Sequence, residues 1–458
     1  MKKNNSSRRS FIKKVAVGSA AIATVPTILT AKESSTIRIQ SQNKIEFDEK
    51  VSANDNIQIA VIGAGGMGTA DANTALKIPG VKLVAACDLY DGRLEAAKER
   101  WGKDIFTTKD YLEILDRDDI DAVIVGTPDH WHQKISVDAM NKGKHVYCEK
   151  PMVHAIEEGY DVIKAQKKNN VVFEVGSQGL SSVGNEKAKE LLEDGAIGEL
   201  NYAEGFWARN SPTGAWQYTI PEDASEDTVD WKRFLKDYKY IPFDPLRFFR
   251  WRNYLDYGTG MAGDLFVHLF SSLHFITSSY GPQKIAAMGG LRFWKDGREV
   301  PDVLLGMFDY PETKQHPGFD LSLRCNFVDG TSGTTYLRLV GNEGSMNVMW
   351  DKVVLRTNEK NEPQDAFLKG KQAEAASKVP PRKKMLPPRE LVYQVEEGYR
   401  GAHYDHHANF YNAIRNGKTV VEDAVFGLRA AAPALACNNS YFDSKFIKWD
   451  PKNMKLKS

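Results

Sequence analysis

The residues of this 458-residue chain that point most directly to chemistry form a glycine turn. Residues 57–68 read IQIAVIGAGGMG, an apolar run that ends in the spacing G-x-G-x-x-G and opens onto a helical pattern. In that setting Gly63 permits a tight turn, Gly65 lets the backbone approach a pyrophosphate, and Gly68 lets the helix pack closely on the strand. The turn therefore predicts a site for the phosphates of a dinucleotide.

An acid further along the chain completes this pattern. A second apolar run, residues 81–88, ends in Asp88, 20 residues after Gly68. A carboxylate in this place accepts hydrogen bonds from a ribose 2′-OH and repels a 2′-phosphate, so it favours NAD over NADP. Three residues next to the glycine turn or to Asp88 are assigned to the same cofactor site: Gly66, Met67 and Arg93.

A second set of residues could move a proton. Asp264 and His268 are four residues apart in a segment with helical apolar spacing, which places both side chains on one helix face. A carboxylate near an imidazole can fix its tautomer, as it does for catalytic histidines. An Asp/His pair at this spacing is also common as an ordinary helix-surface pair, and the spacing alone leaves that alternative open.

The elements that must position these residues alternate between strand and helix. Strand patterns at 120–128 and 145–148 are separated by a helical pattern at 133–141. Such alternation predicts a parallel, doubly wound sheet, in which ligands bind beyond the carboxyl ends of the strands. The sheet is expected to bring four strand-end residues beside the glycine turn: Thr127, Pro128, Glu149 and Lys150. A lysine there can meet a cofactor or its substrate.

Taken in this order, the motifs resemble those of the Gfo/Idh/MocA oxidoreductases, a family named for glucose–fructose oxidoreductase, inositol dehydrogenase and a rhizopine-catabolism protein. The first-domain motifs are GAGGMG at 63–68, Asp88, TPDHWH at 127–132 and CEKP at 148–151. Second-domain motifs are Trp251-Arg252, DYGTG at 256–260 and GDLFVH at 263–268. The likeness covers roughly residues 57–450.

The resemblance implies an α/β fold in two parts. A Rossmann domain with a doubly wound parallel sheet would occupy residues 57–176, and an α/β domain with a large open, mostly antiparallel sheet would occupy residues 177–458. The family's members often assemble as dimers or tetramers, so we expect a homodimer or homotetramer.

The resemblance also implies roles for individual residues. His268 would be the general base for a hydroxyl proton, Lys150 would donate a hydrogen bond to the developing alkoxide, and Asp264 would orient and charge-balance the two. The cofactor site then also includes Thr127, Pro128, His132, Glu149, Lys150 and Gln178. The substrate site includes Lys150, Gln178, Arg252, Asp264 and His268. Some relatives carry an arginine where this chain has Gly179 or Leu180, and its absence leaves the substrate contacts open.

The leading hypothesis is an exported NAD-dependent oxidoreductase that acts on a hydroxyl carbon of a carbohydrate or polyol. The alternative is a redox-neutral glycosidase or epimerase, since some relatives keep NAD tightly bound and oxidise the sugar only transiently. A third reading, a cofactor-holding protein without catalysis, is disfavoured by the intact Lys150, Asp264 and His268.

Other stretches of the second domain carry weaker signals. The irregular segment 211–253 is rich in Trp, Tyr and Arg, and it could either stack on sugar rings or cover a sheet or a subunit contact. From residue 319 alternating patterns predict antiparallel strands, and such a sheet is a natural subunit interface. Residues 357–390 read as a polar excursion, and a helical stretch at 423–440 is expected to pack back on the fold.

The remaining histidines are weak candidates for ligands. His130 and His132 form an H-x-H without an evident third ligand, so no metal is expected. His403, His406 and His407 precede a helical pattern at 408–416, and one of them could reach the substrate pocket.

The N-terminus carries a targeting pattern. Residues 7–14 read SRRSFIKK and are followed by a mildly apolar, alanine-rich run, which resembles a twin-arginine export signal ending near Ala31. An uncleaved anchor or a chance basic N-terminus is the alternative. We expect residues 1–31 to be a signal peptide, residues 32–56 a linker, and the mature protein to be periplasmic or otherwise exported, with no stable membrane span.

Composition excludes several classes of function. The formal net charge of +1 provides no field for binding nucleic acid. The four cysteines form no C-x-x-C pair, so a disulfide framework or a zinc site is not expected.

Overall fold

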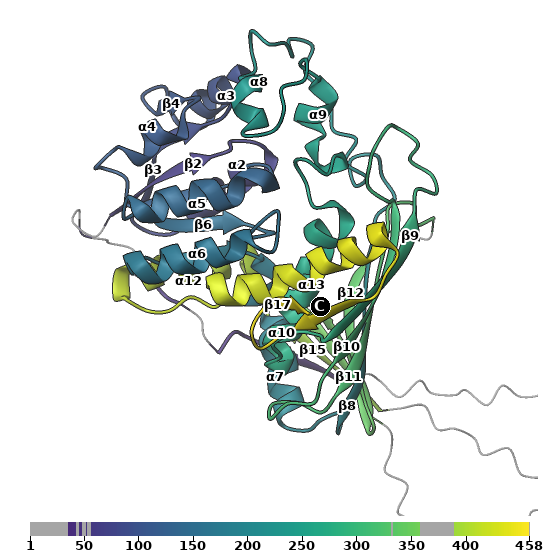
Figure 1. Ribbon diagram of the computed structural model, residues 1–458. Coiled ribbons are helices and arrows are strands. Elements are labelled where there is room, and N and C mark those ends of the chain that lie inside the picture. The colour runs from purple at the N-terminus through teal and green to yellow at the C-terminus, as the bar shows by residue number, and fades with distance from the viewer. Residues whose placement is uncertain are drawn as a thin grey trace, which may run out of the picture. The chain divides into compact units, whose positions relative to one another are not determined.

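A computed structural model describes residues 35–42, 45–47, 52, 56–330, 333–357 and 389–457. Two sheets organise residues 57–457, and helices lie on both faces of the first and on one face of the second (Figure 1). The predicted signal peptide, about half of the predicted linker and most of the polar excursion lie outside the described residues. Among the described residues, no helix combines the length and apolar character that crossing a membrane requires.

The first sheet is the predicted Rossmann sheet. Its six strands run in the order β4-β3-β2-β5-β6-β7, and every neighbouring pair is parallel. The strands are β2 (Ile57–Ile62), β3 (Val81–Cys87), β4 (Phe106–Thr108), β5 (Ala122–Val125), β6 (His145–Glu149) and β7 (Phe173–Gly176). Their near-continuous burial follows from apolar residues on both faces, as expected of a parallel sheet covered by helices.

Helices connect these strands in the predicted alternation. They are α2 (Gly66–Ala75), α3 (Asp91–Trp101), α4 (Tyr111–Leu115), α5 (His132–Asn141) and α6 (Glu158–Asn169), with a short 3₁₀ turn η2 (Asp129–Trp131) before α5. The order of the strands reverses beside β2, because the chain continues from β2 to β3 and β4 on one side and then returns to β5, β6 and β7 on the other. The connections that follow β2 and β5 therefore lead away from each other at the carboxyl end of the sheet. A crevice at this point is where open α/β sheets bind ligands.

The second sheet has eleven strands in the order β1-β15-β14-β13-β12-β8-β11-β10-β9-β16-β17. The strands are β1 (Ser35–Ile39), β8 (Leu200–Ala208), β9 (Lys284–Gly290), β10 (Val303–Tyr310), β11 (Phe319–Asn326), β12 (Thr335–Gly341), β13 (Gly344–Met349), β14 (Lys352–Thr357), β15 (Arg389–Val395), β16 (Ile447–Asp450) and β17 (Lys455–Lys457). Among the strand pairs described for this sheet, β8 and β11 are parallel and the others antiparallel, so the predicted mostly antiparallel sheet is confirmed.

Three helices cover the face of this sheet that is turned toward the Rossmann sheet: α7 (Val183–Glu193), α10 (Val267–Thr277) and α13 (Ala424–Asp443) (Figure 1). A fourth, α12 (Ala402–Asn416), packs on α2 and on the Rossmann core through Tyr404, Phe410 and Tyr411. The helical stretch predicted at 423–440 corresponds to α13, which packs back on the fold as expected. One continuous apolar cluster runs from the Rossmann strands through α13 to the large sheet, which fixes the two sheets relative to each other.

The structure also contains strands that the sequence pattern does not reveal. β10 alternates in burial but not in polarity, because Leu305 and Met307 are apolar and exposed while Leu304 and Phe308 are buried. β4 has only three residues, which is too short for a periodic signal. The helix predicted at 408–416 starts earlier, at Ala402, so His403, His406 and His407 lie within it rather than before it.

Candidate active site

The glycine turn connects β2 to α2 with the geometry that the fingerprint requires. Gly63 has φ +92°, and a Cβ there would lie 2.6 Å from the backbone of Gly126. A Cβ on Gly68 would lie 2.0 Å from the Gly63 carbonyl oxygen, so only glycine lets the helix approach the strand this closely. Helix α2 begins at Gly66 without a side-chain cap, and a Cβ on Gly66 would meet nothing within 4 Å. An uncapped helix N-terminus facing open space suits a phosphate.

Asp88 lies at the carboxyl end of β3, beside this turn. Its carboxylate accepts a hydrogen bond from the Tyr90 amide at 3.1 Å and forms an ion pair with Arg93 at 3.4 Å. The Arg93 guanidinium lies against the rings of Phe248 and Phe249, 5.7 and 5.6 Å from the centroids. The acid is therefore held in place next to the position of a ribose.

The loop after β5 is fixed by a buried histidine. The Nδ1 of His132 lies 2.7 Å from the Pro151 carbonyl oxygen and its Nε2 lies 2.9 Å from the Thr127 carbonyl oxygen. Burial by itself lowers the pKa of His132, but the acceptors around it, among them Cys148, Asp129 and the Pro151 carbonyl, raise its pKa to about 10. A protonated imidazole donates to both carbonyls, so His132 joins the Thr127 and Lys150–Pro151 loops.

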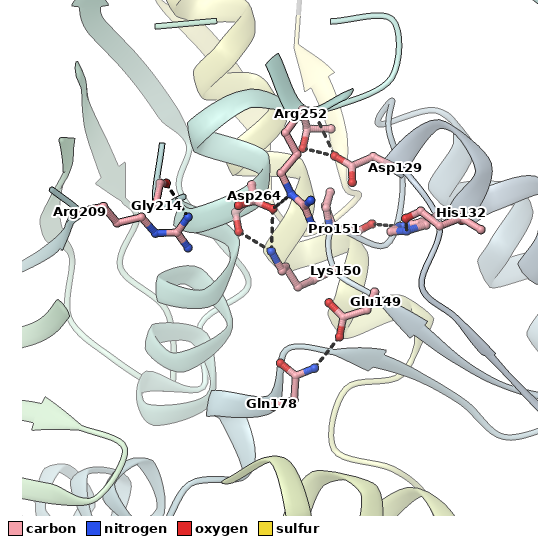
Figure 2. Close-up of polar contacts among 12 residues, drawn as sticks. Asp129, His132, Glu149, Lys150, Pro151, Gln178, Arg209, Gly214, Arg252 and Asp264 are labelled. Carbon is pink, nitrogen blue, oxygen red and sulfur yellow. Dashed lines mark hydrogen bonds and ion pairs between the residues drawn. The ribbon is translucent and has the colours of Figure 1, made fainter. Parts of the chain in front are cut away.

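Lys150, which follows β6, forms the centre of a charged cluster (Figure 2). Its Nζ donates to the carboxylate of Asp264 at 2.9 Å and to the Asp264 carbonyl oxygen at 2.8 Å. The Nε of Arg252 donates to the same carboxylate oxygen at 3.1 Å. The side chains of Lys150 and Asp264 are only 10% and 6% exposed. Burial opposes ionisation of this carboxyl, but Lys150 and Arg252 outweigh it and hold the pKa of Asp264 below its usual range.

Asp264 and His268 come from a segment that is not a uniform α-helix. Residues Ala262–Phe266 form a π-helical turn, η5, that continues into α10, which holds His268. Gly263 packs against Thr259, where a Cβ would lie 2.1 Å from the hydroxyl oxygen. Both side chains reach the same cavity, as predicted, and π-helical turns of this kind recur at functional sites.

His268 is held by aromatic contacts rather than by the carboxylate. Its ring stacks on Trp207, with centroids 5.2 Å apart, and its Nδ1 is buried without a hydrogen-bond partner. The described hydrogen bonds of Asp264 go to Lys150 and Arg252, so the predicted orientation of His268 by Asp264 is not seen. Burial and the Lys150 charge lower the pKa of His268 well below its usual range, so the imidazole is neutral and can accept a proton.

Glu149 and Gln178 form a buried pair beneath this cluster. The Gln178 amide donates to Glu149 (Figure 2) and, at 3.2 Å, to the Tyr147 hydroxyl. Burial and the nearby Asp71 raise the pKa of Glu149 well above its usual range. Asp71 itself, on α2, has a pKa raised by burial to about 7. Among the described contacts, Lys150 forms its ion pair with Asp264, and Glu149 accepts from Gln178.

The glycine turn, Asp88 and the charged cluster around Lys150 open onto one cavity of ≈ 600 Å³ between the two sheets. Of the residues predicted for the site, those lining it are Gly63, Gly65, Gly66, Met67, Asp88, Arg93, Thr127, Pro128, Glu149, Lys150, Gln178, Arg252, Asp264 and His268. Gly68 and His132 do not line it, since one permits helix packing and the other joins two loops. The residues fit a dinucleotide at one end of the cavity, with the charged cluster at the other.

Several lining residues were not predicted from the sequence. Trp207 and Arg209 follow each other at i, i+2 along β8 and its extension, so both face the cavity. Trp350 lies between β13 and β14 and meets His403 of α12 edge to face, with centroids 5.8 Å apart; His403 is one of the three histidines expected to include a pocket residue. An alternating strand pattern could have given the shared face of Trp207 and Arg209, but nothing local indicates which sheet face meets the cofactor.

The structure gives the aromatic segment 211–253 two places, and neither tests the purposes weighed for it. Trp231 and Phe234 pack in a small aromatic cluster with Tyr257. The segment also lines the cavity through Trp216, Tyr218, Thr219, Arg233, Phe234, Phe248, Phe249, Trp251 and Arg252.

The other histidines have structural partners. His130 is buried with its Nε2 2.8 Å from the Phe234 carbonyl oxygen, and His406 lies between the Ser181 hydroxyl and the Val175 carbonyl at 2.7 and 2.8 Å. His407 stacks on Tyr147. Of the three histidines on α12, His403 is the one that reaches the cavity. Within the described ranges, no cluster of three or more His, Cys, Asp or Glu side chains could hold a metal ion.

Two family models match the chain and agree with this architecture. An oxidoreductase family model for an NAD-binding Rossmann fold matches residues 57–177, and one for a C-terminal alpha/beta domain matches residues 189–448.

Curated relatives match a smaller part of the chain. An alpha-N-acetylgalactosaminidase from Shewanella oneidensis is 28% identical over 234 residues, 47% of this chain and 50% of the relative. A glycosyl hydrolase family 109 protein from Shewanella baltica is 27% identical over the same shares. The chain spans about half the length of the curated relatives it matches.

Solved structures share the fold over most of the chain. Levoglucosan dehydrogenase, in complex with NADH and levoglucosan, superposes with a TM-score of 0.62 at 17% identity, covering 86% of this chain and 99% of that chain. The WlbA dehydrogenase from Bordetella pertussis, in complex with NADH and UDP-GlcNAcA, gives 0.63 at 15% identity, covering 86% and 98%.

Proposed function

The chain belongs to the Gfo/Idh/MocA family of NAD-binding oxidoreductases, and from that premise we propose that it transfers hydride between NAD and a hydroxyl carbon of a carbohydrate or polyol. One observation carries the proposal. The glycine turn at Gly63 and the cluster of Lys150, Asp264 and His268 open onto the same cavity.

The residues of the cluster have complementary roles in this proposal. Bound NAD supplies a nicotinamide ring that accepts the hydride. As the C–H bond breaks with its electron pair, the hydroxyl proton passes to the neutral imidazole of His268. Because His268 Nδ1 is buried, Nε2 is the nitrogen left to accept this proton.

Lys150 donates a hydrogen bond to the oxygen as it gains negative charge. Asp264 fixes the Lys150 ammonium through two contacts, one from the carboxylate and one from the carbonyl oxygen of the same residue. Trp207 holds His268 by stacking. Trp251 and Trp350 line the same cavity and offer aromatic faces to a sugar ring.

The redox-neutral glycosidase remains a second candidate, because two curated relatives are named as a galactosaminidase and a family 109 glycosyl hydrolase. In such chemistry a transient ketone would acidify the neighbouring C–H, and loss of that proton would expel the anomeric substituent as an alcohol. Water would then add to the enone, and the hydride would return from the same cofactor. The base and the cation needed for the oxidation step are the same His268 and Lys150.

One purification separates the two candidates. The purified protein is denatured and the supernatant is assayed for NAD(H), and the intact protein is then offered sugars and chromogenic glycosides. Stoichiometric reduction of the cofactor supports the oxidoreductase, and aglycone release without accumulation of NADH supports the glycosidase. Absence of nucleotide together with no binding of added NAD would contradict both.

We further propose export and self-association. Arg8 and Arg9 stand in the twin-arginine pattern, and export of a folded protein would carry its NAD with it; changing both to Lys should retain the protein in the cytoplasm.

The exposed apolar side chains of Met288 (77%) and Met307 (68%) on neighbouring strands suit a subunit contact through the open sheet face. Light scattering on wild type and Met307→Lys tests this: a dimer or tetramer that dissociates supports it, and a wild-type monomer contradicts it.

A further inference from the structure

The substrate end of the cavity has more positive than negative charge. Three cations meet there: Lys150, Arg209 and Arg252. Asp264 is the ionised acid among them, and it already contacts both Lys150 and Arg252. Glu149 lines the same region, but its carboxyl group accepts from the Gln178 amide, and burial and Asp71 raise its pKa well above the usual range. Asp129 does not line the cavity, and its buried carboxylate accepts from the Thr259 amide and hydroxyl.

Arg209 is the cation without a carboxylate partner among the described residues. The one hydrogen bond described for its guanidinium runs from Nη1 to the Gly214 carbonyl oxygen at 3.0 Å. The other cations of the cavity differ in this respect, since Arg93, Lys109 and Arg233 each pair with an acid. A guanidinium has five N–H donors, so most of those on Arg209 are left for a ligand.

Arg209 is nonetheless held firmly. Its amide donates to Asn326 at 2.8 Å and its carbonyl accepts from Asp329 at 3.0 Å. Its guanidinium lies 5.8 Å from the centroid of Phe327. Figure 2 shows the side chain directed toward Asp264 and Lys150. Its charge helps to lower the pKa of Asp264, with a smaller effect than Lys150 and Arg252, and the pKa of His268, with a smaller effect than burial and Lys150. A pre-positioned guanidinium of this kind binds planar anions with two parallel hydrogen bonds.

On these observations, and resting on the proposed function, we propose that the substrate is an acidic sugar whose carboxylate binds Arg209 while its reacting hydroxyl lies between Lys150 and His268. The Trp207 ring, two residues before Arg209 on the same strand face, would lie along the sugar between these groups. The carboxylate would offset the surplus positive charge, which an oxidised nicotinamide increases.

The test compares matched acidic and neutral sugars on the NAD-loaded full chain. Hexuronic acids of gluco, galacto and manno configuration are paired with the corresponding hexoses, each free and as the 4-nitrophenyl glycoside. Hexose 6-sulfates and 6-phosphates form a third group. Reduction of the cofactor, nitrophenol release and calorimetric binding are measured for wild type, Arg209→Gln and the control Arg117→Gln. Arg117 carries the same charge but pairs with Asp119 away from the cavity.

We expect wild type to favour a uronic acid over its neutral partner by roughly 10- to 150-fold, which is what a hydrogen bond to a charged group contributes. Arg209→Gln should lose that preference because KM rises by more for the acid than for the neutral sugar, and Arg117→Gln should keep it. A preference for neutral sugars, a preference for sulfate or phosphate esters, or an unchanged preference in Arg209→Gln overturns the proposal.

The binding measurement separates this proposal from the proposed function. If uronic acids bind in an Arg209-dependent way but no compound changes the cofactor or releases nitrophenol, the proposed chemistry fails and the acid site stands. If sugars are oxidised or cleaved without any dependence on Arg209 or on the carboxylate, the chemistry stands and the acid site fails. If no acidic sugar binds, the acid site is wrong.

Discussion

The two ends of the cavity are built in different ways. The nucleotide end comes from one continuous segment, in which backbone N–H groups, three glycines and Asp88 follow each other between β2 and the end of β3. The substrate end is made of side chains from distant segments, with Lys150 after β6, Arg209 after β8, and Asp264 and His268 before and within α10. An end built from backbone tolerates changes in most side chains, whereas an end built from buried charges depends on each one.

This contrast predicts that chemistry and cofactor binding can be lost separately. The largest effect is expected for Lys150→Ala, because it removes both the donor to the developing alkoxide and the partner of Asp264. We expect turnover to fall about 100- to 10,000-fold while NAD affinity, measured by calorimetry, changes little. Lys142→Ala, which removes an exposed ion pair with Asp116, should leave both unchanged. Wild-type turnover in Lys150→Ala would show that the two ends do not divide the work in this way.

His268→Ala should have the next largest effect, at least about 100-fold on turnover. His274 is a matched control on the same helix, since it is buried against the Tyr310 hydroxyl at 2.8 Å and does not line the cavity. We expect His268→Ala to lose turnover with a near-normal Tm and His274→Ala to lose Tm with near-normal turnover. The opposite pattern would make His268 a structural residue.

The pH profile sharpens the same assignment. A base must be neutral to act, and burial together with the Lys150 charge lowers the pKa of His268 well below its usual range. The acid limb of kcat should therefore lie below the ordinary histidine pKa of about 6.5, with full activity above it. In Lys150→Met the positive charge is gone, the pKa of His268 rises, and the limb of the residual activity should move to higher pH. A limb that stays in place would show that Lys150 does not act on this imidazole.

At the nucleotide end, a methyl group should do more damage inside the turn than outside it. Gly68→Ala places a Cβ 2.0 Å from the Gly63 carbonyl, so we expect a loss of about 1–3 kcal/mol in the free energy of unfolding, measured by urea titration. Gly66→Ala meets nothing within 4 Å and should keep the stability of the wild type. Equal stability of the two variants would contradict the close helix–strand approach described for this turn.

The smallest effect is expected for Asp88→Ala. Loss of the carboxylate frees Arg93 and removes the repulsion of a 2′-phosphate, so the ratio of NAD to NADP affinity should fall about tenfold, or ~1.4 kcal/mol. Asp119→Ala, which removes an exposed acid that pairs with Arg117 outside the cavity, should leave the ratio unchanged. A constant ratio in Asp88→Ala would assign cofactor discrimination to other residues.

The two ends also differ in how well the sequence predicts them. The glycine turn and Asp88 are set by local spacing, and the parallel sheet brought Thr127, Glu149 and Lys150 to the same edge as expected. The i, i+4 spacing gave the correct shared face for Asp264 and His268, although through a π-helical turn. It did not give their partners, because Lys150 and Arg252 reach the carboxylate from outside the helix.

The residues missed at the substrate end depend on long-range packing. Arg209 and Trp207 face the cavity because β8 lies in the middle of the large sheet, between β11 and β12, and strand order is not written in a local pattern. His132 was assigned to the cofactor because it lies in a strand-end motif, yet its two ring nitrogens contact the Thr127 and Pro151 carbonyls. The exposed apolar side chains of β9 and β10 hid the alternation that would have revealed these strands.

The claim that Lys150 and His268 carry hydride transfer from a sugar to bound NAD is tested by the absorbance of reduced nicotinamide in the NAD-loaded protein after a saturating sugar is added. We predict that a sugar reduces the wild-type cofactor, transiently if the reaction is redox-neutral. Lys150→Ala and His268→Ala, with NAD still bound, should show this signal at least about a hundredfold more slowly. Reduction at the wild-type rate in both variants would contradict it, as would a wild-type protein that neither contains nor binds NAD.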